Sequence, residues 1–150
     1  MANELIVKNI VLIDAPMDKV WDVLVNPEQT KKYMFGCETV SNWQVGDALL
    51  WRGELDGKPM VFVKGSIVEI NHGSYLAYTT FDPNNTAMAD VPENYLTVSY
   101  TLEDRDGKTE LTVTQGDYTK VADGQKRFEE AMEAGGWEGI LEQIQILAQQ

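Results

Sequence analysis

The chain opens with an almost uninterrupted run of apolar residues. Leu5–Ile13 is mostly apolar and rich in β-branched side chains, which predicts a well-buried strand. The run stops at Asp14-Ala15-Pro16, where proline favours the first turn of a helix and Asp14 lies just upstream as a capping acceptor. Apolar residues with helical spacing follow and predict a short amphipathic helix; they are Met17, Val20, Trp21 and Leu24.

A second short helix is predicted directly after the first. Asn26-Pro27-Glu28 combines a capping residue, a proline and an acidic residue in the first turn, all typical of a helix N-terminus. We expect this helix to run to about Met34. After Gly36 the pattern changes to segments typical of strands.

Short turns divide the middle of the chain into antiparallel strands. Asp56-Gly57 and Asp106-Gly107 are strong hairpin signals, because both central residues of such turns adopt positive φ. Asn71-His72-Gly73 marks a third turn. Apolar and polar residues alternate most strictly around Asp106-Gly107, so one face of that hairpin should be buried. The predicted strands are Ala48–Gly53, Met60–Ile70, Tyr75–Phe81, Leu96–Leu102 and Thr109–Gln115.

Two further segments complete the pattern. Asp82–Glu93 holds prolines and asparagines, so we expect a long loop, a kind of segment that is often functional and a possible lid. Val121–Gln149 has an apolar stripe at helical spacing and predicts one long helix. Gly135-Gly136 within it costs about 1 kcal/mol per glycine, which indicates a kink or a close approach to the sheet.

These elements predict an α+β domain. Their order is one strand, two short helices, about six strands joined by hairpins, and one long helix. The last helix is the only element large enough to cover the concave face of a curved antiparallel sheet. The length of 150 residues fits a single domain over residues 1–150.

The net charge of the chain disfavours some classes of binding partner. Acidic residues outnumber basic ones 24 to 12, which gives a net charge of −12. This charge repels phosphate backbones and anionic membranes, so binding to either is not expected. No run approaches the ~18 apolar residues of a membrane span, and Met1–Lys8 lacks a basic segment followed by an apolar one. Cys37 is the only cysteine, so an internal disulfide is impossible and a cytoplasmic location is expected.

Short fragments spread in order over nearly the whole chain match one known family. They are Asp14-Ala15-Pro16, Val20-Trp21, Asn26-Pro27-Glu28, Val45-Gly46, Asp56-Gly57-Lys58, Lys64-Gly65, Val68-Glu69-Ile70, Pro92-Glu93-Asn94-Tyr95, Val98-Ser99-Tyr100, Lys108-Thr109, Leu111-Thr112-Val113-Thr114-Gln115, and Gly136-Trp137 with Leu141. Through these fragments the chain resembles the bacterial relatives of the C-terminal domain of the Hsp90 ATPase activator, within the START/Bet v 1-like superfamily. The resemblance implies a helix-grip fold, with a cavity between the sheet and the long helix that accepts an apolar small molecule. It implies no catalytic residues, since members of the superfamily include carriers, enzymes and chaperone cofactors.

Residues suited to line such a cavity recur along the predicted elements. Tyrosine and tryptophan combine an apolar body with a polar tip that orients a ligand, although for any one of these residues packing in the core is the simpler interpretation. A dry void of ~300 Å³ would cost about 7 kcal/mol, comparable with the whole stability of a domain, so such a cavity needs water or a ligand. The candidate lining residues are Trp21, Met34, Phe35, Trp51, Phe62, Tyr78, Tyr95, Tyr100, Trp137 and Leu141.

Groups for catalysis or metal binding are scarce. His72 is the only histidine and lies in a predicted turn, where exposure to solvent is the simplest interpretation. Cys37 has no basic neighbour nearer than Lys32, so we interpret it as a small buried or half-buried hydrophobe. No pair of histidines or cysteines has ligand spacing, so neither a metal nor another cofactor is predicted. Acid–base chemistry would require inward-pointing groups among Arg52, Glu54, Asp82 and Glu93.

Three functions remain open from the sequence. The aromatic-rich strands and the glycine-containing last helix favour an intracellular binding protein for a hydrophobic or aromatic, lipid-like small molecule. One alternative, implied by the resemblance, is an interaction domain that modulates an Hsp90-type chaperone. Another is a cyclase- or hydrolase-like enzyme that uses cavity carboxylates and tyrosines. Both a monomer and a homodimer are compatible with the sequence.

Overall fold

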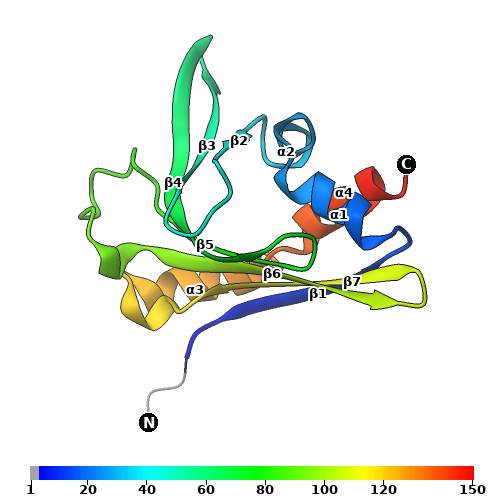
Figure 1. Cartoon of the computed structure of the whole chain (residues 1–150). Coiled ribbons are helices and arrows are strands. Elements are labelled where there is room, and N and C mark those ends of the chain that lie inside the picture. Colours follow the sequence, from blue (N-terminus) through cyan, green and yellow to red (C-terminus); the bar gives the residue numbers. More distant parts are fainter. Residues whose placement is uncertain (1–3) are drawn as a thin grey trace.

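The computed structural model describes residues 4–150, so the first three residues of the segment Met1–Lys8 lie outside it. Within the described residues, seven antiparallel strands form one curved sheet in the order β1-β7-β6-β5-β4-β3-β2 (Figure 1). The strands are β1 (Val7–Ile13), β2 (Glu38–Val40), β3 (Ala48–Leu55), β4 (Lys58–Asn71), β5 (Tyr75–Thr80), β6 (Leu96–Arg105) and β7 (Lys108–Gly116). The α-helices are α1 (Met17–Val25), α2 (Pro27–Tyr33), α3 (Gly124–Glu133) and α4 (Glu138–Ala148). This architecture is the α+β helix-grip fold predicted from the sequence.

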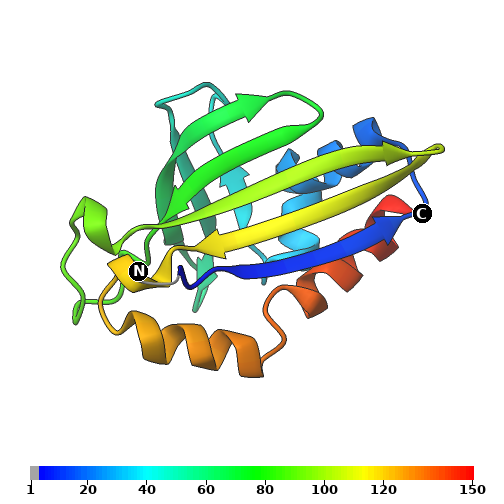
Figure 2. The same cartoon turned by 90° about the horizontal axis from the view of Figure 1, so that it is seen from below.

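Helices from both ends of the chain pack together against the sheet. α1 contacts α2 and α4, and α4 also lies against β1. Figure 2 shows α3 and α4 following one another alongside β1. The core between helices and sheet is fully buried; its members include Val20, Leu24, Tyr100, Leu111, Val113 and Ile144. Over residues 4–150, no helix is long and apolar enough to cross a membrane.

The two short helices begin by different means. The Asn26 side chain accepts a hydrogen bond of 3.0 Å from the Glu28 N–H, so the predicted cap of α2 is confirmed. The predicted cap of α1 is wrong, because α1 starts after Pro16 and has no side-chain cap. Asp14 lies two residues before Pro16, too far upstream for its carboxylate to reach the first helical N–H groups, and its backbone N–H instead donates to Gln149 at 2.9 Å.

Both predicted two-residue hairpins are confirmed. Asp56 and Gly57 join β3 to β4 with φ of 53° and 77°. Asp106 and Gly107 join β6 to β7 with φ of 56° and 89°. Positive φ at both positions gives the turn the twist of the flanking strands, which is why short polar and glycine residues stand there.

The predicted single helix over Val121–Gln149 is instead two helices, α3 and α4. Gly135 and Gly136 adopt φ of 86° and 61°, which ends α3. A Cβ on Gly136 would lie 2.5 Å from Asn9 Oδ1 and 2.7 Å from Val7 Cγ1. The glycine pair therefore provides both features expected of it, because it breaks the helix and lets the backbone touch β1.

The first strand is buried on one face only. Val7 and Ile13 are 1% and 0% exposed, whereas Ile10 and Leu12 on the other face are 55% and 50% exposed. The prediction of a well-buried strand is therefore half wrong. The physical reason is position, because β1 is an edge strand whose outer face has no covering element among the described residues.

Candidate functional site

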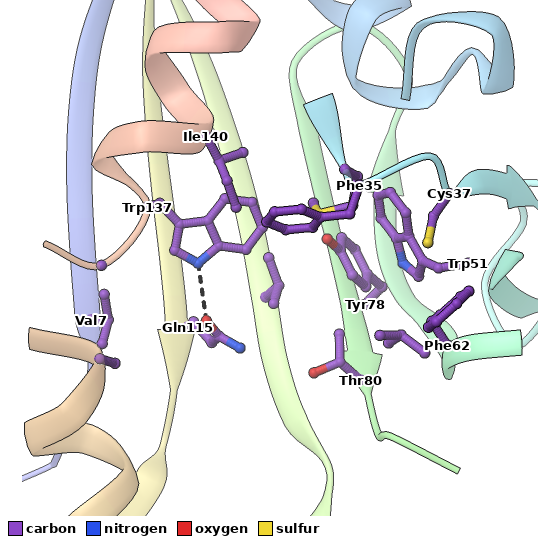
Figure 3. Close-up of a pocket in the computed structure, with 15 residues that line it drawn as sticks. Val7, Phe35, Cys37, Trp51, Phe62, Tyr78, Thr80, Gln115, Trp137 and Ile140 are labelled. Carbon is purple, nitrogen blue, oxygen red and sulfur yellow. Dashed lines mark hydrogen bonds between the residues drawn. The ribbon is translucent and has the colours of Figure 1, made fainter. Parts of the chain in front are cut away.

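A cavity of about 390 Å³ lies between the sheet and the junction of α3 and α4 (Figure 3). Every strand except β2 contributes a lining side chain, so the cavity follows the concave curve of the sheet. Most of its wall is hydrophobic, and none of the described residues that line it is charged. The cavity is open to solvent, and the lining residue Phe35 is 88% exposed. Because it is open, water can enter, and the full cost of a dry void does not apply.

Six of the ten residues proposed from the sequence come together in this wall. They are Met34, Phe35, Trp51, Phe62, Tyr78 and Trp137. In Figure 3, Phe35 lies between Trp137 on one side and Trp51 on the other. Contact of these six with a ligand stays a prediction.

The other four proposed residues lie elsewhere. Tyr100 and Leu141 are buried in the core, at 0% and 3% exposure. Trp21 is half-buried and meets the ring of His72 at 6.1 Å. Tyr95 stacks on Phe81 at 4.9 Å, away from the cavity wall. Composition alone does not distinguish an aromatic ring beneath the wall from one that forms it.

Nine lining residues were not proposed from the sequence. They are Val7, Cys37, Val63, Thr80, Val98, Gln115, Ala131, Gly136 and Ile140. Gln115 is the informative one among them, because it continues the inward-facing series Leu111, Val113 in β7. The alternation of β7 predicts an apolar residue at position 115, so the glutamine found there was the sequence signal for a polar group facing the interior.

A hydrogen bond fixes the orientation of the Gln115 amide. The indole N–H of Trp137 donates to Gln115 Oε1 at 3.0 Å, shown as the dashed line in Figure 3. Trp137 is itself held in place, because its backbone N–H donates to Asn9 Oδ1 at 2.9 Å. Asn9 also donates through Nδ2 to the Gly135 carbonyl at 3.2 Å. The helix break thus positions the polar group that faces the cavity.

Two buried tyrosines form a pair, of which Tyr78 lines the cavity and Tyr100 lies behind it. The hydroxyls of Tyr78 and Tyr100 lie 2.6 Å apart, and their rings meet edge to face at 5.6 Å. Burial raises the pKa of Tyr78 and of Tyr100 well above the ordinary tyrosine value. Both groups therefore stay protonated near neutral pH and serve as neutral hydrogen-bonding groups.

The chemical groups discussed for catalysis are placed outside the cavity. Arg52, Glu54, Asp82 and Glu93 are all exposed, and no carboxylate of residues 4–150 lines the wall. The alternative that requires cavity carboxylates therefore has no support at this site. His72 is exposed in the turn between β4 and β5, as predicted.

Cys37 is 6% exposed, which confirms its interpretation as a small buried residue. Burial raises the pKa of its thiol, so the thiolate is disfavoured near neutral pH. Within the described part of the chain, no cluster of three or more histidine, cysteine or carboxylate side chains is arranged to hold a metal ion.

The loop expected to act as a lid does not line the cavity. Residues of Asp82–Glu93 lie against the start of α3, where Arg127 Nη1 contacts the Met88 sulfur at 3.8 Å. The loop ends in a short 3₁₀ turn at Pro92–Asn94, and Asn94 Oδ1 accepts from the Ala122 N–H at 3.0 Å. These contacts attach the loop beside a smaller hollow of about 180 Å³, which adjoins the cavity and shares Val63, Thr80 and Gln115 with its wall.

Comparison with known proteins places the chain in a family. Residues 14–149 match the model of the Activator of Hsp90 ATPase homolog 1-like protein family. A search of curated proteins finds no match. A protein from Cytophaga hutchinsonii with a known solution structure is 39% identical, with a TM-score of 0.73, over 97% of this chain and 94% of that one.

More distant structures share the fold. A protein from Mycobacterium smegmatis is 16% identical with a TM-score of 0.73, over 96% of this chain and 90% of that one. The Aha1 dimer from Colwellia psychrerythraea is 14% identical with a TM-score of 0.68, over 96% of each chain. With the family model spanning both short helices, strands β2 to β7 and both C-terminal helices, the chain belongs to the Activator of Hsp90 ATPase homolog 1-like family.

Proposed function

We propose that this protein binds an apolar small molecule in the cavity between the sheet and the α3–α4 junction. The observation that carries the proposal is the wall itself, an open hollow of about 390 Å³ with aromatic and aliphatic lining. Concave, mostly apolar hollows of roughly 300–1,000 Å³ with a few fixed polar groups are typical of small-molecule sites. A packed core without a role in binding would fill this volume with side chains.

The size of the cavity bounds the affinity. Burying ~300 Å² of apolar ligand surface contributes about 7.5 kcal/mol before the cost of association is subtracted. Dissociation constants in the micromolar range follow from that balance. A carrier or sensor of moderate affinity fits this range better than a permanent reservoir.

Fluorescence of the uncharged dye N-phenyl-1-naphthylamine tests the proposal. Ala131 lines the cavity from α3, so Ala131→Trp should fill it and weaken dye binding by about tenfold or more. Ala134→Trp is the matched control, because Ala134 is exposed three residues further along the chain and does not line the cavity. The absence of dye binding to the unaltered protein, or equal loss in both variants, would refute the proposed site.

The family name supports a second candidate, modulation of an Hsp90-type chaperone. The net charge of −12 opposes docking on an acidic partner surface and favours a basic one. An ATPase assay with the chaperone of the same organism decides this candidate. We expect a changed rate that is lost at high salt if the interaction exists, and an unchanged rate removes the candidate.

A further inference from the structure

We propose that the cavity selects an uncharged apolar ligand that carries a hydrogen-bond acceptor, such as the carbonyl oxygen of a ketone or ester. This inference rests on the proposed function and adds the class of ligand. It follows from the polar atoms of the wall, because these offer hydrogen-bond donors to a ligand while no charged side chain lines the wall.

Gln115 supplies the first donor. Its Oε1 is occupied by the Trp137 indole N–H at 3.0 Å, and a tryptophan N–H can only donate, so the amide cannot turn around. Nε2 is therefore the free end of the amide, with two N–H groups and no partner among residues 4–150. Because Gln115 lines the wall, these donors are available to a ligand.

Trp51 supplies the second donor. The residue is 4% exposed, and its indole N–H has no hydrogen-bond partner in the described chain. No buried side-chain nitrogen or oxygen of the described residues lacks a partner, so this N–H must reach accessible space. Trp51 lines the cavity and packs beside Tyr78 at 6.2 Å, so that space is the cavity.

The tyrosine pair supplies the third donor. Two hydroxyls 2.6 Å apart hold two hydrogens, and only one of them can lie between the oxygens. Tyr100 is 0% exposed and does not line the cavity, whereas Tyr78 does. The favourable arrangement has Tyr100 donating to Tyr78, which leaves the Tyr78 hydrogen for a ligand and no hydrogen stranded in packed protein.

Acceptors and charges are few by comparison. Thr80 Oγ1 donates to the Leu96 carbonyl at 3.3 Å and keeps its lone pairs as a weak acceptor. No cation of the described residues lines the wall to pair with a carboxylate, and no anion lines it to pair with an ammonium group. Burying either charge without a partner is unfavourable, so a neutral acceptor fits best.

Three diphenyl probes of similar size test the inference by titration of the nitrogen-15-labelled protein: diphenylmethane, benzophenone and benzhydrylamine. Benzophenone adds a carbonyl to the hydrocarbon, and benzhydrylamine adds an ammonium group that the acidic protein as a whole would attract. We expect benzophenone to bind about fivefold tighter than diphenylmethane, the effect of one neutral hydrogen bond, and benzhydrylamine to bind weakest. The indole N–H resonance of Trp51 should shift downfield with benzophenone only.

Two variants assign the effect to the wall. Gln115→Glu keeps an oxygen acceptor for Trp137 and removes the amide donor, while Trp51→Phe removes the indole donor and keeps an aromatic ring. Each should reduce the preference for benzophenone by about twofold or more. Trp21→Phe is the matched control, since Trp21 lies against His72 outside the cavity, and its preference should equal that of the unaltered protein.

The outcomes separate the two proposals. Equal binding of benzophenone and diphenylmethane, or tighter binding of benzhydrylamine, overturns the inference and leaves the apolar site standing. A preference for benzophenone that survives in both Gln115→Glu and Trp51→Phe also overturns it. If no probe and no dye binds, the proposed function fails and the inference fails with it.

Discussion

Trp137 shows how one residue can serve the fold and the site together. Its backbone N–H is bound by Asn9 of β1, and its indole N–H is bound by Gln115 of β7. The residue is 7% exposed, and its ring meets that of Tyr100 edge to face at 5.9 Å. The same side chain therefore joins the start of α4 to the sheet and orients the amide at the cavity wall.

A single carboxylate, Asp117, is expected to make the stability of the fold depend on pH. Its carboxylate accepts hydrogen bonds from the backbone N–H groups of Thr119 and Leu5, both at 3.0 Å, and these bonds lower its pKa. A pKa that is lower in the folded state stabilises the protein above the unfolded pKa, and this contribution is lost as the pH falls through the folded pKa.

Asp117→Asn should therefore lower the urea midpoint at pH 7, and the difference from the unaltered protein should shrink at about pH 3, below the ordinary carboxyl pKa. Urea unfolding followed by circular dichroism at both pH values measures it. Glu130→Gln, which removes one exposed charge on α3, controls for net charge and should show little effect at either pH. A deficit of Asp117→Asn that grows in acid would contradict the assignment.

At the scale of elements, the break between α3 and α4 decides where the cavity forms. In a straight helix over Val121–Gln149, all apolar residues of the stripe would lie along one side of a single axis. The turn at Gly135 and Gly136 instead seats the backbone on β1 and redirects α4 toward α1. The cavity wall includes residues from both sides of this turn, Ala131 before it and Ile140 after it.

Gly136→Leu tests this role. Positive φ costs about 1–2 kcal/mol for a residue with a Cβ, and the clash with β1 adds about 1–3 kcal/mol, so a loss of about 2–5 kcal/mol in the free energy of unfolding is expected. Chemical denaturation measures it. Gly139→Leu is the matched control in α4, where a Cβ meets nothing within 4 Å, and helix propensity should stabilise it by about 0.5–1 kcal/mol. Equal stability of the two variants would show that the break does not rest on β1.

The whole molecule combines an apolar interior site with a strongly acidic surface. The curve of the sheet separates the β3–β4 hairpin from the layer of β1, β7 and β6 (Figure 1). The cavity is lined by residues from both parts of the sheet. The acidic residues that give the net charge of −12 contribute to the surface, because over residues 4–150 none of them is buried and none lines the cavity. Self-repulsion across the surface therefore opposes the compact state without altering the wall.

Salt should relieve this repulsion. Because the screening length is about 10 Å at 0.1 M ionic strength, raising sodium chloride from about 20 mM to 300 mM should stabilise the fold by about 1 kcal/mol and raise Tm by about 3 °C. Scanning calorimetry measures the change. A triple variant of exposed α3 residues, with Glu129, Glu130 and Glu133 changed to glutamine, should have a higher Tm at low salt and a smaller salt effect. A fall in Tm with salt in the unaltered protein would contradict the argument.

Local signals in the sequence determined the elements of this protein. Asn26 caps α2, and Asp56-Gly57 and Asp106-Gly107 make the two tight hairpins. The glycine pair at 135–136 marks where the C-terminal helical segment is interrupted. These features depend on a few neighbouring residues, so they are visible without knowledge of the rest of the chain. Together with the order of elements they predicted an α+β domain with a curved antiparallel sheet covered by the C-terminal segment, and the family resemblance implied the helix-grip fold.

Only the tertiary structure decided which side chains form the cavity wall. Trp51 and Tyr100 are both aromatic residues in strands, yet one lines the cavity and the other lies beneath it. The orientation of the Gln115 amide is fixed by a hydrogen bond from Trp137, which lies 22 residues later in the chain. Such relations depend on the curve of the sheet and on where the helix break meets β1, and both are set by contacts between distant segments that local periodicity does not encode.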